Sequence, residues 1–195
     1  TSLSIPQGLA VCYSGFRDGQ RPGDVYPSYE QVKEDLEIIK NHWNYIRLYS
    51  CDQHARTVLE VIRNEQLPLG VMLGAYLDGE ASNPNCPWGG EFSDEQISIN
   101  KKKNSEEVET LILWANQFKD IVIALAVGNE SCVDWSGNMV PVENMIAHVR
   151  KAKAETEQPI TFCENYVPWL TKLAPLVEEL DFISIHTYPL WENKT

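Results

Sequence analysis

The chain has 195 residues, of which 43% are hydrophobic and 23% charged, and this balance is that of a globular domain with a core rather than a disordered chain. Its 16 basic and 28 acidic residues give a net charge of −12, which disfavours nucleic acid and favours a neutral or polar partner. No apolar run approaches the roughly 20 residues needed to span a bilayer, and five scattered cysteines without a CxxC pair predict neither a disulfide framework nor a zinc site.

Six short apolar runs recur along the chain, and each is followed by a polar loop and a helical pattern. Continuous apolar runs of this kind are typical of strands buried on both faces of a parallel sheet. The strands are expected at residues 8–15, 45–50, 69–77, 121–130, 159–165 and 181–189.

Helical patterns lie between these runs, at residues 28–42, 53–66, 104–118, 141–156 and 168–180. The first pattern begins with Ser28 and Gln31, which form a capping box. Ser105, just ahead of acidic residues, suits the start of the third helix, and Pro141 suits the first turn of the fourth. Pro175 interrupts the last pattern.

Alternating strands and helices predict a parallel α/β fold, either doubly wound or a (β/α)₈ TIM barrel. No GxGxxG motif follows the first strand, so a dinucleotide site is not expected. Polar side chains end most of the strands, and a barrel would gather these ends into one mouth. They are Tyr13, Arg47, Asp52, Asn129, Glu130, Glu164, Asn165, His186 and Tyr188.

We therefore predict one catalytic barrel domain over residues 1–195, with six of the eight strand–helix units present. A full barrel takes about 250 residues. The domain is accordingly expected to be incomplete at its C-terminus, unless the fold is not a closed barrel.

The stretch "IVIALAVGNES" places Glu130 at the end of a buried strand, where burial should raise its pKa and make it a general acid near neutral pH. Asn129 could hydrogen-bond a sugar hydroxyl. Neighbouring residues of a flat strand point to opposite faces, so both can reach one ligand only if the strand end bulges, which Gly128 would ease. The alternative is a loop that caps a helix.

Three further strand ends carry candidate substrate contacts. Glu164 either pairs with Glu130 as a second catalytic carboxylate or, as we prefer, binds substrate or orients Glu130. Arg47 would place a fixed positive charge in the mouth, either to hold a carboxylate ionised or as a salt bridge at the rim. His186 and Tyr188 are two residues apart on one strand, so both side chains should face the same side and touch substrate.

Six Trp and eight Tyr residues exceed the needs of a core, and several fall in loops. Each could stack on a sugar ring or simply cap the edge of the core. They are Tyr26, Tyr29, Trp88, Trp135, Trp169 and Trp191. Trp191 follows the last strand as a candidate platform, and Trp88 lies in the long loop 78–94, which in a barrel would line the cleft.

Four motifs in order, "GLAVCYSG", "IRLYSCD", "AVGNE" and "FISIHTYPLW", resemble the family 17 glycoside hydrolases, especially bacterial laminarinase-like members. The resemblance implies a (β/α)₈ barrel that cleaves β-1,3-glucan of the laminarin type with retention of configuration; some members transfer glucan chains instead. It also implies a secreted, periplasmic or cell-surface location, although the chain shows no signal peptide, and neither cofactor nor metal.

By the same resemblance, Glu130 matches the general acid/base and Asn129 its amide neighbour. The positions that match the surroundings of the catalytic subsite are Tyr13, Arg47, Glu164, His186 and Tyr188.

One departure from the family matters most. The family's nucleophile is a second Glu at the end of the seventh strand, in a Glu-x-Gly-Trp type of motif, which this sequence lacks. Retention needs two carboxyl groups about 5–5.5 Å apart. We therefore expect the nucleophile to come from outside this chain, from a complementary C-terminal segment or chain, and the isolated chain to be inactive.

Three alternatives remain open at this point. The chain could be a non-hydrolytic β-glucan-binding protein on a truncated barrel, or a β-1,3-glucanosyltransferase. It could also be an inverting hydrolase that uses Glu130 and Glu164, for which the carboxyl groups should lie about 6.5–9.5 Å apart.

Overall fold

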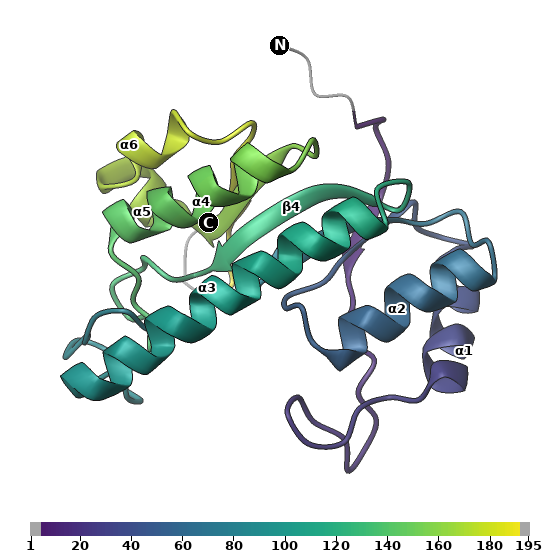
Figure 1. Cartoon of the computed structure of the whole chain (residues 1–195), viewed down its shortest axis with the longest axis horizontal. Helices are drawn as coiled ribbons and strands as arrows, with labels where there is room; N and C mark the ends of the chain where they lie inside the picture. The colour runs from purple at the N-terminus through teal and green to yellow at the C-terminus, as the bar shows by residue number, and fades with distance from the viewer. Residues whose placement is uncertain (1–4, 192–195) are drawn as a thin grey trace.

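The computed structural model describes residues 5–191, in which short parallel strands alternate with helices (Figure 1). The strands are β1 Ala10–Cys12, β2 Tyr45–Arg47, β3 Gly70–Ala75, β4 Val122–Asn129, β5 Ile160–Asn165 and β6 Ser184–His186. The helices are α1 Tyr29–Ile39, α2 Gln53–Asn64, α3 Asp94–Gln117, α4 Val142–Glu155, α5 Tyr166–Thr171 and α6 Ala174–Val177. Residues 1–4 and 192–195 lie outside the described part.

The strands form one sheet in the order β1-β2-β3-β4-β5-β6, and every neighbouring pair is parallel. A doubly wound sheet reverses its strand order at a switch point, whereas a barrel adds each strand on the same side. The sheet is therefore a partial TIM barrel, as predicted, and all six expected strands are present in shorter form.

The helices cover the outer face of this sheet. Figure 1 shows α3 lying along β4, with α1 and α2 on one side and α4 to α6 on the other. Fully buried side chains fill the space between helices and sheet. The largest of these include Leu36, Ile46, Leu73, Leu111, Leu125, Met145, Ile160 and Phe162.

The helix starts confirm the sequence analysis in part. The capping box of Ser28 and Gln31 is formed at α1, as predicted. Asp52, which the sequence placed among the strand-end residues, caps α2 by accepting a hydrogen bond from the Ala55 amide. Pro141 lies one position earlier than expected, at the N-cap of α4. The last predicted helix is divided into α5 and α6, and Pro175 stands in the first turn of α6.

The start of α3 was predicted wrongly. The helix begins at Asp94, ten residues before the expected start, and Ser93 rather than Ser105 is its cap. The reason is that its buried positions in this stretch are the amides of Asn100 and Asn104, which hydrogen-bond the loop after β3. An apolar periodicity cannot reveal a helix face made of amides.

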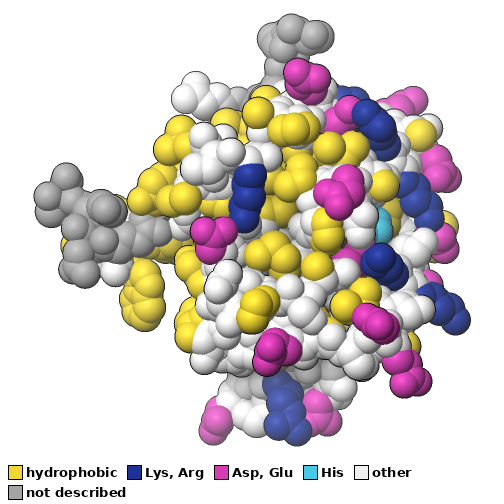
Figure 2. All heavy atoms as spheres, turned by 90° about the vertical axis from the view of Figure 1, so that its left-hand side faces the viewer, with side chains coloured by type: hydrophobic (Ala, Val, Ile, Leu, Met, Phe, Trp, Pro, Cys, Tyr) yellow, Lys and Arg dark blue, Asp and Glu magenta, His cyan; other side chains and the backbone are white. Residues whose placement is uncertain are grey.

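Apolar side chains also reach the surface. The face that carries α5 and α6 shows several of them among scattered charges (Figure 2). On these two helices they are Val167, Leu170 and Val177. Within residues 5–191, no helix has both the length and the apolar character to cross a bilayer. All five cysteines are free thiols.

Gly74 in β3 is a site where a methyl group should destabilise the fold. A Cβ atom there would lie 2.5 Å from the carbonyl oxygen of Leu48 and 2.9 Å from the backbone of Tyr49. Because neither backbone atom can move away freely, we expect Gly74→Ala to lower the free energy of unfolding by about 1–3 kcal/mol. A Cβ atom at Gly137 would lie 3.6 Å from its nearest neighbour, so Gly137→Ala should change the free energy of unfolding little. Urea unfolding followed by circular dichroism measures both; equal stabilities would contradict the close approach.

Candidate active site

The end of β4 bulges, which lets neighbouring residues reach the same site. The pairing of β4 with β5 shifts register between Ala126 and Asn129. Gly128 has φ +84°, and a Cβ atom there would lie 2.8 Å from the Met145 side chain. Glu130 follows with φ +48°, a left-handed conformation that costs about 1–2 kcal/mol in a non-glycine residue and clusters at functional sites. The predicted bulge is confirmed.

Four of the predicted side chains meet Glu130 in one hydrogen-bonded chain. Arg47 donates from Nη2 to Oδ1 of Asn129, and its Nη1 lies 2.9 Å from Nε2 of His186. Nδ1 of His186 lies 2.8 Å from Oε1 of Glu130. The Tyr188 hydroxyl donates to the same oxygen at 3.0 Å. Residues from β2, β4 and β6 are thereby joined at the mouth.

The chain of donors determines the protonation of His186. Because a guanidinium is always protonated and can only donate, Nε2 of His186 must accept from Arg47. The ring proton therefore resides on Nδ1 and is donated to Glu130. Arg47 is thus hydrogen-bonded to the carboxylate only by way of His186, and no direct Arg47–Glu130 hydrogen bond is present among the described residues.

This arrangement lowers the pKa of Glu130 rather than raising it. The hydrogen bond from His186 is the largest cause; partial burial opposes it, and the Tyr188 hydrogen bond and the charge of Arg47 add to it. The expectation of a raised pKa is therefore wrong for the described residues. That expectation considered only burial, which raises the pKa. The effect of burial is outweighed by hydrogen-bond donors that come from another part of the chain, at and after β6.

Glu164 is fully buried and binds backbone amides. Its exposed fraction is 0%, and its two oxygens accept hydrogen bonds from the backbone amides of Cys132 and Asn165, both at 2.7 Å. Burial raises its pKa to about 7, and the negative charge of Glu130 adds to the rise. The expected substrate contact does not fit this burial; Glu164 instead holds the base of the loop that follows Glu130.

Tyr13 also lies apart from the hydrogen-bonded chain. Its hydroxyl donates to Asp35 in α1 at 2.8 Å, and Asp35 is in turn clamped by both terminal nitrogens of Arg17. Its ring lies against His54 in α2. These partners are on the helical side of β1, so the structure does not bring the Tyr13 hydroxyl to Glu130.

Aromatic side chains wall a cleft of about 650 Å³ beside Glu130. Its lining residues are Pro87, Trp88, Glu130, Trp135, Tyr188 and Trp191. The rings of Trp88 and Trp135 are 6.1 Å apart and inclined at 58°. Exposed aromatic faces next to a few polar groups suit a ligand with flat apolar faces and hydroxyl edges, such as a sugar ring.

Three of the loop aromatics named from sequence have other partners. Trp169 packs on Phe162 and donates its indole proton to the carbonyl of Glu164. Tyr26 packs on Phe16, and the Tyr29 hydroxyl donates to Glu65. These aromatics support the core and its edge.

Tyr49 was missed by the sequence analysis. The guanidinium of Arg47 lies 4.6 Å from the centre of its ring, and burial raises the pKa of Tyr49 to about 12. It stands two residues after Arg47, and the same spacing that related His186 to Tyr188 would have placed both on one side.

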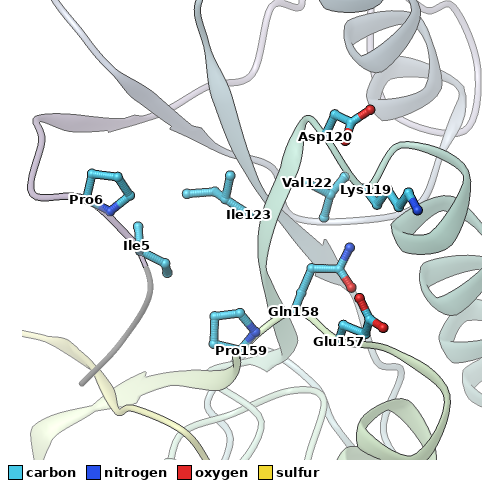
Figure 3. Close-up of a pocket in the computed structure, with 9 residues that line it drawn as sticks. All are labelled: Ile5, Pro6, Lys119, Asp120, Val122, Ile123, Glu157, Gln158 and Pro159. Carbon is cyan, nitrogen blue, oxygen red and sulfur yellow. The ribbon is translucent and has the colours of Figure 1, made fainter. Parts of the chain in front are cut away.

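A second hollow lies at the opposite end of the sheet. It is lined by Ile5, Pro6, Lys119, Asp120, Val122, Ile123, Glu157, Gln158 and Pro159. Figure 3 shows Ile5 and Pro6 facing Ile123 and Pro159 across it, at the end of the sheet where β4 and β5 begin. In barrels the chemistry occurs where strands end, so we place the candidate site at Glu130. Residues 5–191 contain no cluster of three or more His, Cys, Asp or Glu side chains that could hold a metal ion.

Comparison with known proteins points to glycoside hydrolases. The family model described as the BtgE/BtgC glycoside hydrolase domain matches residues 10–195. The structure is similar to an endo-laminarinase from Formosa Hel1_33_131, with 26% identity, a TM-score of 0.75 and coverage of 95% of this chain and 51% of that one. The chain thus spans about half the length of that enzyme.

Two more distant similarities show the fold alone. A family 17 β-1,3-glucanosyltransferase from Rhizomucor miehei is 21% identical, with a TM-score of 0.64 and coverage of 96% of this chain and 59% of that one. An active-site mutant of that enzyme in complex with laminaritriose is 20% identical, with a TM-score of 0.65 and coverage of 94% of this chain and 58% of that one. No curated protein sequence matches the chain.

Removing the His186 ring should raise the pKa of Glu130. In His186→Leu the largest lowering cause is lost, and Tyr188→Phe, which removes the weaker hydrogen bond, should raise that pKa less. The folded pKa of Glu130 lies below the unfolded pKa of about 4.5. This interaction therefore stabilises the fold at pH values above the unfolded pKa, and the stabilisation is lost as pH falls through the folded pKa. Carbon-13 NMR titration of the Glu130 carboxyl measures the change; an unaltered pKa in His186→Leu would refute the assignment.

Glu164 should make the protein less stable as pH rises. The folded pKa of this acid is raised, so the unfolded chain loses its proton first, and stability should fall between about pH 4.5 and 7. A rise from 4.5 to about 7 corresponds to about 3 kcal/mol. Urea unfolding across this range should show the fall in the wild type and not in Glu164→Gln; parallel curves would show that Glu164 does not titrate in this range.

Proposed function

The chain belongs to the BtgE/BtgC glycoside hydrolase domain family, and from this premise we propose that it serves in the retaining hydrolysis of laminarin-type β-1,3-glucan, with Glu130 as general acid/base. One observation carries the proposal: the Glu130 carboxylate, held by His186 and Tyr188, lines a cleft walled by tryptophans. A carboxyl group beside a sugar-sized aromatic cleft is what protonation of a glycosidic oxygen requires.

The β-1,3 linkage is supported by the relatives. The endo-laminarinase is 26% identical to this chain, and an active-site mutant of the more distant transferase was solved with laminaritriose. A polymeric substrate of this kind also fits the proposed secreted, periplasmic or cell-surface location.

The hydrogen bonds suggest which oxygen carries the proton. His186 and Tyr188 both bind Oε1 of Glu130, and no described residue hydrogen-bonds Oε2. Oε1 can accept these bonds whether the group is ionised or protonated on Oε2. We infer that Oε2 delivers the proton to the glycosidic oxygen and later takes one from water, while His186 and Tyr188 keep their places.

A second carboxylate is needed for retention and would also correct the acidity of Glu130. At about 5–5.5 Å, its negative charge would raise the lowered pKa of Glu130 towards neutrality. Glu130 is the one acidic group among the described residues that line the cleft. We propose that the nucleophile is supplied from outside residues 5–191, by a complementary C-terminal segment or chain.

The burial of Glu164 argues against the inverting pair. A base that activates water must reach that water, and Glu164 is fully buried with both oxygens bound to backbone amides. Its own role is better described as positioning of the loop after β4.

A second candidate function is glucan binding without hydrolysis. The lowered pKa of Glu130 favours it, because a carboxylate that stays ionised at neutral pH is a good hydrogen-bond acceptor and a poor acid. A β-1,3-glucanosyltransferase would share the first step of hydrolysis and use a sugar hydroxyl in place of water.

The test compares Glu130→Gln with the wild type on laminarin and on β-1,4-linked glucan oligosaccharides, each protein together with the complementary C-terminal segment or chain that is proposed to carry the nucleophile. If the wild type releases sugar from laminarin, Glu130→Gln should slow release by about 10²–10⁴-fold, the usual contribution of a general acid/base, with oligosaccharide binding retained. Glu155→Gln, at an exposed position of α4, is the matched control and should leave release unchanged.

Equal release by wild type and Glu130→Gln would refute the role of Glu130. Laminarin-oligosaccharide binding with no release, even with the nucleophile-bearing segment or chain present, would favour the second candidate. Absence of such binding would contradict both.

A further inference from the structure

The two loops that carry Trp88 and Trp135 are bridged close to Trp135 by one buried side-chain amide, that of Asn83. We propose that Asn83 is a positioning residue that fixes the Trp88–Trp135 pair as a single sugar-stacking unit, and so sets the affinity for chains long enough to reach it. The geometric part of this inference stands independently; its consequence for glucan rests on the proposed function.

Asn83 first organises its own loop. It is 5% exposed, and its backbone amide donates to the carbonyl of Gly90 at 2.7 Å. The backbone carbonyl of Asn83 accepts a hydrogen bond from the backbone amide of Cys86 at 3.1 Å. The side-chain Oδ1 of Asn83 accepts one from the backbone amide of Asn85 at 3.2 Å. Trp88 lies between Cys86 and Gly90, so these bonds shape the turn from which it extends.

The side-chain nitrogen of Asn83 then reaches the other loop. Nδ2 donates to the carbonyl of Asp134 at 2.9 Å and to that of Ser136 at 2.8 Å. These two carbonyls flank Trp135, so both protons of the amide hold the backbone on either side of that residue. Only a side-chain amide offers two donors and an acceptor on one planar group.

The other backbone hydrogen bonds between these two loops lie farther along the chain from the two rings: the amides of Glu80 and Ala81 donate to the carbonyl of Met139. Trp88 is 70% exposed, and its ring meets Trp135 at 6.1 Å. The base of the Trp135 loop is held by Glu164 through the amide of Cys132. Both rings extend from loops and line the same cleft, and the Asn83 side chain is the bridge that holds the backbone on either side of Trp135.

Asn83→Ala removes both donors, and Asn85→Ala is its matched control, because Asn85 is the same amino acid in the same loop with an exposed side chain. The indoles of Trp88 and Trp135, 6.1 Å apart and inclined at 58°, should give an exciton-coupled circular-dichroism band. This band is identified as the part of the wild-type spectrum that disappears in Trp88→Phe. We expect Asn83→Ala to lose most of that band and Asn85→Ala to keep it.

Binding of laminarin-type oligosaccharides of increasing length, measured by calorimetry, gives the functional readout. Asn83→Ala should bind the longest chains about tenfold more weakly, as expected for one lost aromatic contact, and the disaccharide as the wild type does. A general loss of structure would weaken all lengths alike and lower the thermal midpoint.

Each outcome decides the inference. A folded Asn83→Ala that keeps the Trp88-dependent band, or loses affinity equally at all lengths, overturns it. If the wild type binds no oligosaccharide, the proposed function fails while the band still decides the role of Asn83. If Asn83→Ala does not fold, NMR hydrogen exchange of the Asn83 side-chain amide in the wild type replaces it: slow exchange supports the bridge, and exchange as fast as that of Asn85 refutes it.

Discussion

The permanent charge of Arg47 is the constraint on which the rest of the site depends. Because it can only donate, it orients the Asn129 amide through one nitrogen and obliges His186 to accept through the other. His186 must then give its proton to Glu130. One side chain from β2 thereby sets the direction of every hydrogen bond that reaches the carboxylate through His186, and with it the charge that Glu130 carries at rest.

The two carboxylates show that a perturbed pKa is not by itself a mark of catalysis. Glu164 has the raised pKa that suits a general acid, yet it is fully buried and binds backbone amides. Glu130 has the lowered pKa, yet it lines the cleft. Burial governs the first, and donated hydrogen bonds govern the second, so access to the ligand has to be weighed with acidity.

Buried polar side chains hold the loops that a barrel uses for recognition. Glu164 binds the base of the loop after β4. Asn83, in the loop after β3, binds the backbone on either side of Trp135 in the loop after β4. Glu80, buried in the loop after β3, accepts hydrogen bonds from Asn144 and from Asn104, and pairs with His148. An unpartnered buried polar group is costly, so such fully bonded groups specify one loop arrangement where apolar packing would allow several.

The sequence by itself determined where the strands lie along the chain, the cap of the first helix, the bulge at Gly128 and the shared side of His186 and Tyr188. Each of these follows from neighbours a few residues apart, through strand alternation, capping or backbone freedom. Only the tertiary structure decided that the Tyr13 hydroxyl turns to α1, that Glu164 binds a loop, and that the pKa of Glu130 falls. These outcomes depend on partners far away in the chain, 139 residues apart for Arg47 and His186, and such partners have no local signature in the sequence.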